Sequence, residues 1–152
     1  PLRLVGSEMC IRDSLTTEQW RDTTEPELGG VPTDVLAAPG EVMFHHSALG
    51  RLAWQVFGGT LRYAANLVPE IADDIVNIDN AIRWGFNWVH GPFEMLDAVG
   101  PIRVIERIRA EGGEMPVMLQ VLAESGSPTF YRTTGNGREY LGSDGGWHTV
   151  PA

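Results

Sequence analysis

The sequence predicts a mostly α domain of four to five packed helices, followed by a small C-terminal antiparallel β-meander. Three observations lead to this fold class. Apolar residues before residue 126 recur at steps of three and four, as on the buried face of a helix. Proline and glycine repeatedly bracket these segments, with Pro just inside a start and Gly just past an end. From Thr129 the pattern changes to a period of two, which is typical of strands.

The first long helix is expected over residues 47–67, with Ser47 as its N-cap. Gly58-Gly59 lies in its middle, where each glycine costs about 1 kcal/mol relative to alanine. We therefore expect another helix to cross closely there. The predicted buried stripe of this helix comprises Leu52/Ala53, Val56/Phe57, Thr60/Leu61, Ala64 and Leu67.

Pro69 opens the second helix, which is expected over residues 70–84. Acidic residues gather at its start, where the positive end of the helix dipole favours them. Its apolar stripe steps by four, three and four residues, which is helical spacing. The acidic residues are Glu70, Asp73 and Asp74, and the stripe comprises Ile71, Ile75, Ile78 and Ile82.

The stretch from Ile78 to Gly100 is the organising segment of the chain. Gly85 is expected to end the second helix, because glycine readily takes the left-handed conformation of a C-terminus. Gly91-Pro92 starts a short helix with a stripe of Phe93, Leu96 and Val99, and Gly100 ends it. The aromatic residues Trp84, Phe86, Trp88 and Phe93 are expected to pack inward as a brace between the two helices. The alternative is that they form an interface with a neighbouring domain or subunit.

Two further helices and three strands complete the predicted order. Pro101 starts a helix with Ile102, Ile105 and Ile108 buried, which Gly112-Gly113 ends. Pro116 starts the next, with Leu119 and Leu122 buried, and Gly126 ends it. The strands are expected at residues 130–132, 138–141 and 147–150, joined by turns at 135–137 and 143–146. Such a meander is only marginally stable alone, so we expect it to pack against the helices.

The central stretch resembles the C-terminal helical domain of NAD-dependent 3-hydroxyacyl-CoA dehydrogenases of fatty-acid β-oxidation. The matching residues are Ile78-Asp79-Asn80-Ala81, Trp84-Gly85-Phe86, Gly91-Pro92-Phe93-Glu94 and Leu96-Asp97-Ala98-Val99-Gly100. The likeness covers about residues 47–150 and is closest to the second helical repeat of the large fused members. The structural signature is Asp79, Trp84, Gly85, Phe86, Gly91, Pro92, Phe93, Asp97 and Gly100.

The resemblance implies a fold like the C-terminal domain of 6-phosphogluconate dehydrogenase. It also implies a parent enzyme that oxidises (3S)-3-hydroxyacyl-CoA to 3-oxoacyl-CoA with NAD and is fused to an enoyl-CoA hydratase. The implied partners are a Rossmann domain and a crotonase-like domain of the same chain, the acyl-CoA substrate and a second copy. None of the family's catalytic, NAD-binding or metal-binding residues carries over, so this piece alone is expected to be inactive and to bind no cofactor.

Four segments are predicted. Residues 1–14 are predicted to be a non-native segment, because residues 5–14 resemble a translated sequencing adapter; the alternative is a frayed natural N-terminus. Residues 15–45 read as a linker rich in Pro and Gly, with at most a helical turn near 33–37. Residues 46–126 form the helical domain, and residues 127–152 form the meander and the start of a linker to a missing domain.

The composition of the chain argues against several classes of partner and site. The net charge is −9, from 20 acidic and 11 basic residues without a basic stripe, so nucleic acid is not an expected partner. The single cysteine, Cys10, excludes an internal disulfide and a cysteine-ligated metal site. No apolar run approaches the roughly 20 residues of a membrane span, and no secretory signal is evident. A cytoplasmic location follows as the default.

Two clusters could carry chemistry of their own. His45-His46 with Asp73-Asp74 offers zinc or iron ligand types, although adjacent histidines of an extended chain point to different sides. They more simply cap the approach to the first helix. His90 with Glu94 and Asp97 could form an acid–base pair, although both carboxylates suit the start of the helix at Pro92.

Two other function classes remain open from the sequence. One is a freestanding helical interaction module, and the other is a small metal-dependent hydrolase built on the His45–Asp74 cluster. Gly-rich turns near the C-terminus lack the strand–GxGxxG–helix context, so they predict no pyrophosphate-binding loop.

Overall fold

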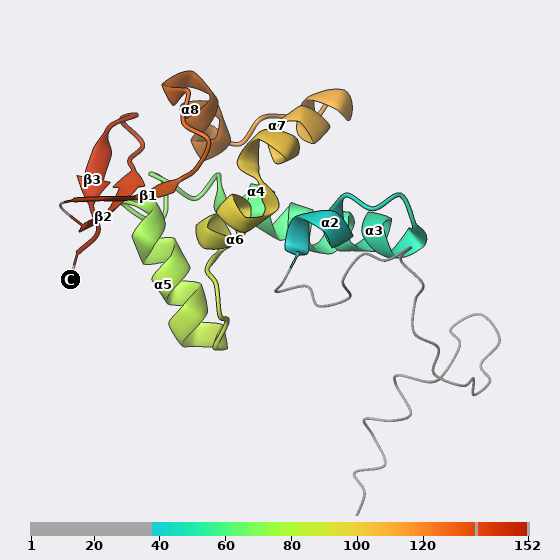
Figure 1. Cartoon of the computed structure of the whole chain (residues 1–152), viewed down its shortest axis with the longest axis horizontal. Coiled ribbons are helices and arrows are strands. Elements are labelled where there is room, and N and C mark those ends of the chain that lie inside the picture. The colour runs from blue at the N-terminus through green and yellow to red at the C-terminus, as the bar shows by residue number, and fades with distance from the viewer. Residues whose placement is uncertain (1–37, 136, 152) are drawn as a thin grey trace, which may run out of the picture.

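The computed structural model describes residues 38–135 and 137–151. Helices dominate and a three-stranded antiparallel sheet follows them, which confirms the predicted fold class. Helix α6 (Pro92–Val99) lies between the other helices, with α7 (Pro101–Ala110) and α8 (Val117–Ser125) above it in Figure 1. The adapter-like residues 5–14 and most of the predicted linker lie outside the described residues.

The N-terminal boundary of the helical domain differs from the prediction. Helix α2 (Pro39–Met43) lies inside the segment expected to be a linker, and Val42 and Met43 are buried. A Cβ on Gly40 would lie 2.8 Å from the carbonyl oxygen of Val99, so α2 packs directly on the end of α6. Pro39-Gly40 is therefore a helix start that needs a small residue for close packing.

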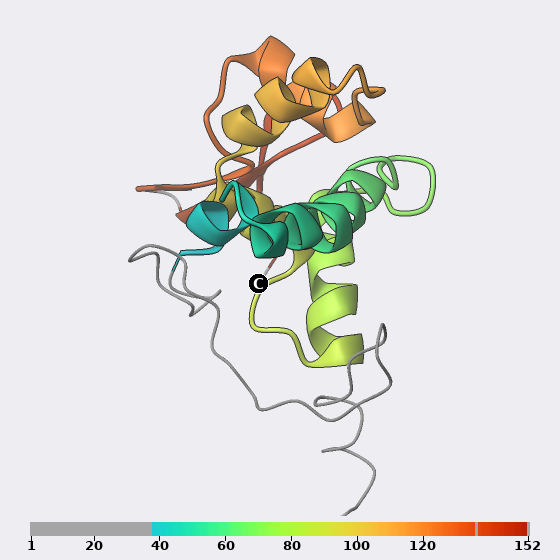
Figure 2. The ribbon, with the colours of Figure 1, turned by 90° about the vertical axis from the view of Figure 1, so that its right-hand side faces the viewer.

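One continuous helical rod follows Ser47, which caps it by accepting a hydrogen bond from the Gly50 N–H at 3.2 Å, as predicted. The rod comprises α3 (Ala48–Ala53), a π-helical turn η1 (Trp54–Gly58) and α4 (Gly59–Ala64) (Figure 2). It ends three residues before the predicted end at 67.

The predicted buried face of this rod is wrong in its N-terminal half, although Leu61 and Ala64 are buried as predicted. Leu52 and Val56 are 54% and 55% exposed, whereas the buried stripe is Trp54, Gly58, Leu61 and Ala65. Both sets have helical spacing, and the set containing Trp54 buries the largest side chain. The predicted helix crossing at Gly58-Gly59 is wrong as well. A Cβ on Gly58 would meet the Trp54 ring at 2.7 Å, and one on Gly59 would meet nothing.

Helix α5 (Ile75–Phe86) begins five residues later than predicted and continues past Gly85. Asp74 caps its start by accepting a hydrogen bond from the Asn77 N–H at 2.8 Å. Its C-cap is Asn87, with a left-handed φ of 55°, not Gly85. Ile75 and Ile78 are buried as predicted, but Ile71 precedes the helix and is 71% exposed.

Helices α6, α7 and α8 begin and end near the proline and glycine residues that were predicted to delimit them. Gly100 (φ 95°) and Gly126 (φ 70°) end α6 and α8 in conformations that favour glycine. The predicted buried residues Phe93, Leu96, Val99, Ile105, Ile108, Leu119 and Leu122 are buried. Ile102 is the exception, at 44% exposed, because Val104 takes the inward position on α7.

The C-terminal strands form the predicted meander in the order β1-β2-β3. They are β1 (Tyr131–Thr134), β2 (Gly137–Leu141) and β3 (Trp147–Thr149). Phe130 and Leu141 are fully buried in the core that the helices form, and the Phe93 and Phe130 rings meet edge to face at 5.0 Å. The meander therefore packs against the helices, which a sheet this small needs for its stability.

No helix of the described part of the chain is long and apolar enough to cross a membrane.

Candidate functional site

The buried carboxylate of Asp79 organises the junction of α5, α6 and β1. Asp79 is 2% exposed, and its Oδ1 accepts a hydrogen bond from the Phe93 N–H at 2.8 Å. Its Oδ2 accepts from the Glu94 N–H at 3.2 Å and from the Tyr131 hydroxyl at 2.8 Å. The N-cap of α6 is Gly91, which has no side chain, so a residue of α5 supplies the cap across the helix junction.

Glycine at position 91 has a steric reason. A Cβ there would lie 2.4 Å from the Cα, Cβ and Cγ atoms of Asp79. The backbone of Gly91 is extended (φ −75°), a conformation open to any residue. Close approach, not backbone freedom, therefore requires glycine here.

Burial raises the pKa of the Asp79 carboxyl to about 6, although the hydrogen bonds from Phe93 and Tyr131 act in the other direction. Burial and the neighbouring Asp79 carboxylate also raise the pKa of Tyr131 above its ordinary value. Tyr131 therefore stays protonated and donates to Asp79. Both carboxylate oxygens of Asp79 are engaged by protein donors, which makes this group a structural tie and not a free base.

Glu94 lies beside this tie and joins α6 to the meander. Its Oε2 accepts from the Gly91 N–H at 3.1 Å, which confirms the predicted role at the start of α6. Its Oε1 pairs with Arg138 at 2.9 Å and, more loosely, with Arg83 at 3.7 Å. Burial would raise the pKa of Glu94, but the Gly91 N–H and the Arg138 guanidinium outweigh it, so this pKa lies below its ordinary value.

The suggested acid–base pair of His90 and Glu94 is not formed in this geometry. Nδ1 of His90 is 4.0 Å from Glu94 Oε2, beyond hydrogen-bond distance, while that oxygen already accepts from Gly91.

Asp97 has a different role from the predicted one at the start of α6. Its carboxylate accepts from the Phe130 N–H at 2.7 Å and from the Tyr131 N–H at 2.9 Å. It therefore fixes the entry of β1 onto α6. Burial raises the pKa of the Asp97 carboxyl to about 6, against the effect of these two hydrogen bonds. The sequence could not assign this partner, because Asp97 and Tyr131 are 34 residues apart.

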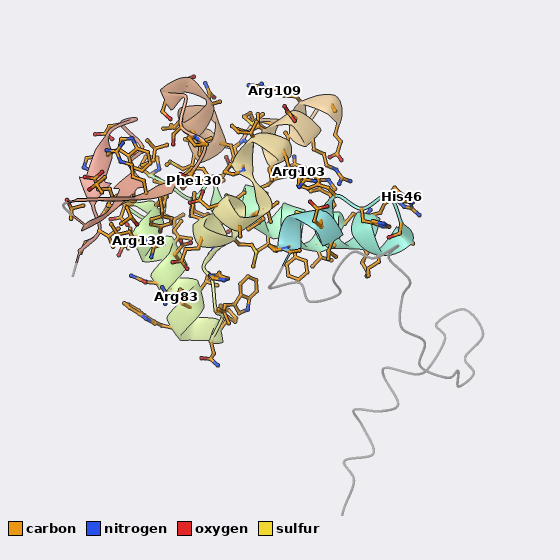
Figure 3. All side chains as sticks on the ribbon, in the orientation of Figure 1. His46, Arg83, Arg103, Arg109, Phe130 and Arg138 are labelled. Atoms are coloured by element: carbon orange, nitrogen blue, oxygen red, sulfur yellow. The ribbon has the colours of Figure 1, made fainter. Side chains whose placement is uncertain are left out.

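A cavity of about 460 Å³ opens between α5 and the meander, next to the carboxylates. This volume is in the range of small-molecule sites, roughly 300–1,000 Å³. Helix α5 contributes Asn80, Arg83 and Trp84, α6 contributes Glu94, and the meander contributes Tyr131 and Arg138. Figure 3 shows Arg83 and Arg138 on this side of the molecule, away from Arg109 and His46.

The prediction of an inward-packed aromatic brace is wrong. Trp84 and Phe86 are 80% and 71% exposed and Trp88 is 37% exposed, so only Phe93 of the four is in the core. Trp84 and Phe86 lie in the last turn of α5, whereas the buried residues of this helix lie further back, at Ile75 to Asp79. The hydrogen bonds of Asp79 and Asp97, and not aromatic packing, connect α5, α6 and β1.

The suggested metal cluster is not assembled. His45 and His46 stack on one another with ring centroids 4.4 Å apart, and His45 Nδ1 accepts from the Ser47 N–H at 3.2 Å. This is the predicted capping role at the first helix, while Asp74 caps α5. Among the described residues, no group of three or more His, Cys, Asp or Glu side chains is arranged to hold a metal ion.

Of the signature residues, the structure brings together Asp79, Gly91, Pro92, Phe93 and Asp97 at the α5–α6–β1 junction. It leaves Trp84, Gly85 and Phe86 on the surface, and Gly100 serves as the C-cap of α6. Tyr131, Arg83 and Arg138 were not singled out from the sequence. The available signal was weak: a Tyr and an Arg on adjacent short strands, one of many such pairs.

The described residues do not supply a dinucleotide-binding fold for NAD. Their strands pair only antiparallel, as a meander, whereas the nucleotide fold needs parallel strands joined by a crossover helix.

Comparison with known proteins gives partial matches. Over 90 residues, the chain is 42% identical to a Bacillus subtilis protein named probable 3-hydroxyacyl-CoA dehydrogenase; the match covers 59% of this chain and 11% of that protein. Over 56 residues, it is 36% identical to a putative fatty acid oxidation complex trifunctional enzyme of Rickettsia felis, covering 37% of this chain and 8% of that protein. The protein of the same name in Rickettsia prowazekii is 30% identical over 56 residues.

No family model matches the chain, and no solved structure matches it. The chain spans only about a tenth of the length of the curated relatives, 11% and 8% for the first two. Within these limits, the resemblance to the 3-hydroxyacyl-CoA dehydrogenases of fatty-acid oxidation is confirmed over part of this chain.

Proposed function

We propose that this chain is part of a longer 3-hydroxyacyl-CoA dehydrogenase and supplies a helical domain-packing region, not the catalytic centre. The observation that carries the proposal is the 42% identity over 90 residues to a protein of that name, of which the match covers 11%. The parent enzyme would oxidise (3S)-3-hydroxyacyl-CoA to 3-oxoacyl-CoA with NAD in fatty-acid β-oxidation. Fusion to an enoyl-CoA hydratase and a cytoplasmic location belong to the same proposal.

The reaction moves a hydride from C3 of the substrate to NAD and the hydroxyl proton to a base. The carboxylates at the α5–α6–β1 junction do not suit the base, because backbone N–H groups and Tyr131 already occupy the oxygens of Asp79 and Asp97. The dinucleotide fold is also not among the described residues. We therefore assign this hydride transfer to a Rossmann domain of the parent chain, whereas a crotonase-like domain of the same chain would carry the enoyl-CoA hydratase reaction.

The surface of the chain supports a packing role. Trp84 and Phe86 at the end of α5 are 80% and 71% exposed, and Val89 in the segment that follows is 62% exposed. Large apolar side chains this exposed are unfavourable in water. A partner that covers them stabilises the complex by about 25 cal/mol per Å² of buried apolar area. A neighbouring domain, or a second copy in a homodimer, would provide that cover.

The alternative is a freestanding helical interaction module, which the same exposed residues favour. The reading frame around this segment separates the two. A GxGxxG-containing segment before it and a crotonase-like segment after it support the dehydrogenase, and flanks without either support the module.

A chimera tests the proposal directly. The segment of the Bacillus subtilis protein that aligns with this chain is replaced by the corresponding residues of this chain, and NAD reduction with a 3-hydroxyacyl-CoA is measured. We expect the chimera to keep activity within about tenfold of the parent, whereas the chain alone gives no NAD reduction.

Two variants of the chimera sharpen the test. Asp79→Ala should abolish activity through loss of the α5–α6 junction, and Arg109→Gln, an exposed residue away from that junction, should not change it. Measurable NAD reduction by the chain alone would refute the assignment of the catalytic centre to other domains. An inactive but well-folded chimera would refute the proposal that this chain is part of a 3-hydroxyacyl-CoA dehydrogenase.

A further inference from the structure

The helical rod from α3 to α4 carries two apolar stripes, and the described residues cover one of them. The inner stripe repeats at steps of four, three and four residues and is buried: Trp54, Gly58, Leu61 and Ala65. The outer stripe repeats at the same steps two residues earlier and is exposed: Leu52, Val56, Gly59 and Tyr63. An offset of two residues is about 200° around a helix, so the two stripes lie on opposite faces of the rod.

An outer face of this kind is unusual for a helix at the surface. Leu52 and Val56 are 54% and 55% exposed and Tyr63 is 68% exposed. A surface helix normally turns polar residues to water, whereas a helix that is apolar on both faces is typical of the middle of a structure. The inner face of the rod packs on α2 and α6. The outer face therefore lacks a second layer.

Gly59 lies in the outer stripe and has no role within the described fold. Its backbone is helical, with a φ of −61°, so no special conformation requires glycine there. A Cβ at this position would meet no atom within 4 Å, whereas the neighbouring Gly58 makes room for the Trp54 ring. Glycine is less favourable than alanine inside a helix. A bare backbone within an apolar stripe is useful to a second helix, because it lets the two axes approach closely.

The charge of the rod indicates the chemistry of such a partner. The chain has a net charge of −9, yet residues 42–69 contain no Asp or Glu. Arg51 and Arg62 lie about three turns apart, on one side of the outer stripe. No acidic side chain of the described residues forms an ion pair with either arginine. Glu111 contacts the rod on its inner side, through Trp54. Acidic groups on a partner would complement the two arginines.

We propose that the outer stripe docks an α-helix from another part of the parent chain. The apolar face of that helix crosses the rod at Gly59, and its acidic side faces Arg51 and Arg62. The source of the helix rests on the proposed function, since the match covers 11% of the longer relative and leaves ample chain to supply it. The surface is separate from the candidate site, because α3 lies at the opposite end of the molecule from the meander (Figure 1).

Thiol labelling of Val56→Cys with N-ethylmaleimide compares the stripe in the chain alone and in the chimera, built to carry residues 48–64. Peptide mass mapping separates the introduced thiol from Cys10 and from cysteines of the parent. We expect labelling at least about tenfold slower in the chimera, because the docked helix excludes the reagent. The matched control is Arg109→Cys, an exposed position on α7, whose labelling rate should differ less than about twofold between the two proteins.

Two further changes test the crossing point and the charge. Gly59→Leu places its side chain in open space in the chain alone, so circular dichroism should show an unchanged fold. In the chimera it should speed labelling of Val56→Cys about tenfold, because it holds the docked helix away from the rod. Arg51→Glu combined with Arg62→Glu should also speed this labelling, because it sets like charges against the acidic side of that helix.

Equal labelling of Val56→Cys in the chain alone and in the folded chimera would overturn the proposal. Protection that Gly59→Leu leaves intact would exclude the crossing at Gly59. Protection in the chain alone that accompanies dimerisation in sedimentation would assign the stripe to a second copy instead, and protection by anionic phospholipid vesicles would assign it to a membrane surface. Failure of the proposed function is read separately, as loss of NAD reduction by the folded chimera.

Discussion

Replacing Asp79 by alanine removes the tie between α5, α6 and β1. The Phe93 and Glu94 N–H groups and the Tyr131 hydroxyl lose their acceptor at once. Phe93 is fully buried, so water does not easily replace the acceptor for its N–H, whereas the partly buried Tyr131 can turn towards the cavity. The damage is therefore concentrated at the start of α6.

The expected loss follows from these contacts. A buried polar group left without a partner costs about 1–3 kcal/mol, and loss of a helix N-cap costs about 1 kcal/mol. Part of this is offset, because removing a carboxyl whose pKa is raised to about 6 also removes its burial cost. We expect a net loss of about 3 kcal/mol, a large share of the roughly 5–15 kcal/mol that stabilises a typical domain.

Urea unfolding followed by far-ultraviolet circular dichroism measures this loss. Ser47→Ala is the matched control, because it removes a single local cap, the Gly50 N–H contact, and should cost about 1 kcal/mol. Asp79→Asn keeps one acceptor oxygen and should fall between the two, which preserves the test if the alanine variant does not fold. An Asp79→Ala cost no larger than that of Ser47→Ala would show that the junction does not depend on this carboxylate.

Three further predictions concern the same junction and its surroundings. Asp97 has a pKa raised to about 6 in the folded state, so it binds more protons folded than unfolded between about pH 4 and 6. The stability of the native sequence relative to Asp97→Asn should therefore be greatest below about pH 4 and fall as the pH rises through 6, and urea midpoints rising over that interval would contradict this. Gly91→Ala should destabilise by more than about 2 kcal/mol because its Cβ meets Asp79, whereas Gly85→Ala, in an open position within α5, should stabilise by about 0.5–1 kcal/mol; thermal unfolding that ranks them the other way would refute the packing described. Trp84→Ala should change the unfolding free energy of this chain by less than about 0.5 kcal/mol, since the side chain is 80% exposed, and a larger loss would place the indole in the core.

Helix ends could be predicted well where local chemistry decides them. Pro92, Pro101 and Pro116 mark helix starts, and Gly100 and Gly126 mark helix ends. Proline fixes its own φ and glycine alone takes left-handed conformations freely, so neither effect depends on distant residues. Gly85 failed as a helix end because Asn87 supplies the left-handed residue two positions later.

Helix faces could be predicted less well, since two apolar stripes compete on the same rod. The stripe with Leu52 and Val56 and the stripe with Trp54 and Gly58 are both spaced as a helix requires. Spacing cannot choose between them. The choice depends on which side chains find a partner, and Trp54 finds Glu111, which accepts from its indole N–H at 3.1 Å, and Arg107, which stacks 4.2 Å above its ring.

The candidate site depended still more on tertiary structure. The sequence identified Asp79, Gly91, Phe93 and Asp97 as one gapped signature but could not say what Asp79 and Asp97 bind. Their partners lie 14 to 52 residues away, and at such separations sequence spacing carries no geometry. Helix α8 shows the same effect, because its Val117 N–H finds the side chain of Asn66.

By itself, then, the sequence determined the fold class, the helix limits set by proline and glycine, the three strands and the resemblance of part of the chain to 3-hydroxyacyl-CoA dehydrogenases. Only the tertiary structure decided which apolar faces are buried, that Trp84 and Phe86 are exposed, and that Asp79 caps a helix other than its own. The physical reason is the separation along the chain over which each effect acts. Backbone conformation is set by each residue and its neighbours, whereas burial and hydrogen-bond partners depend on which distant segments come together.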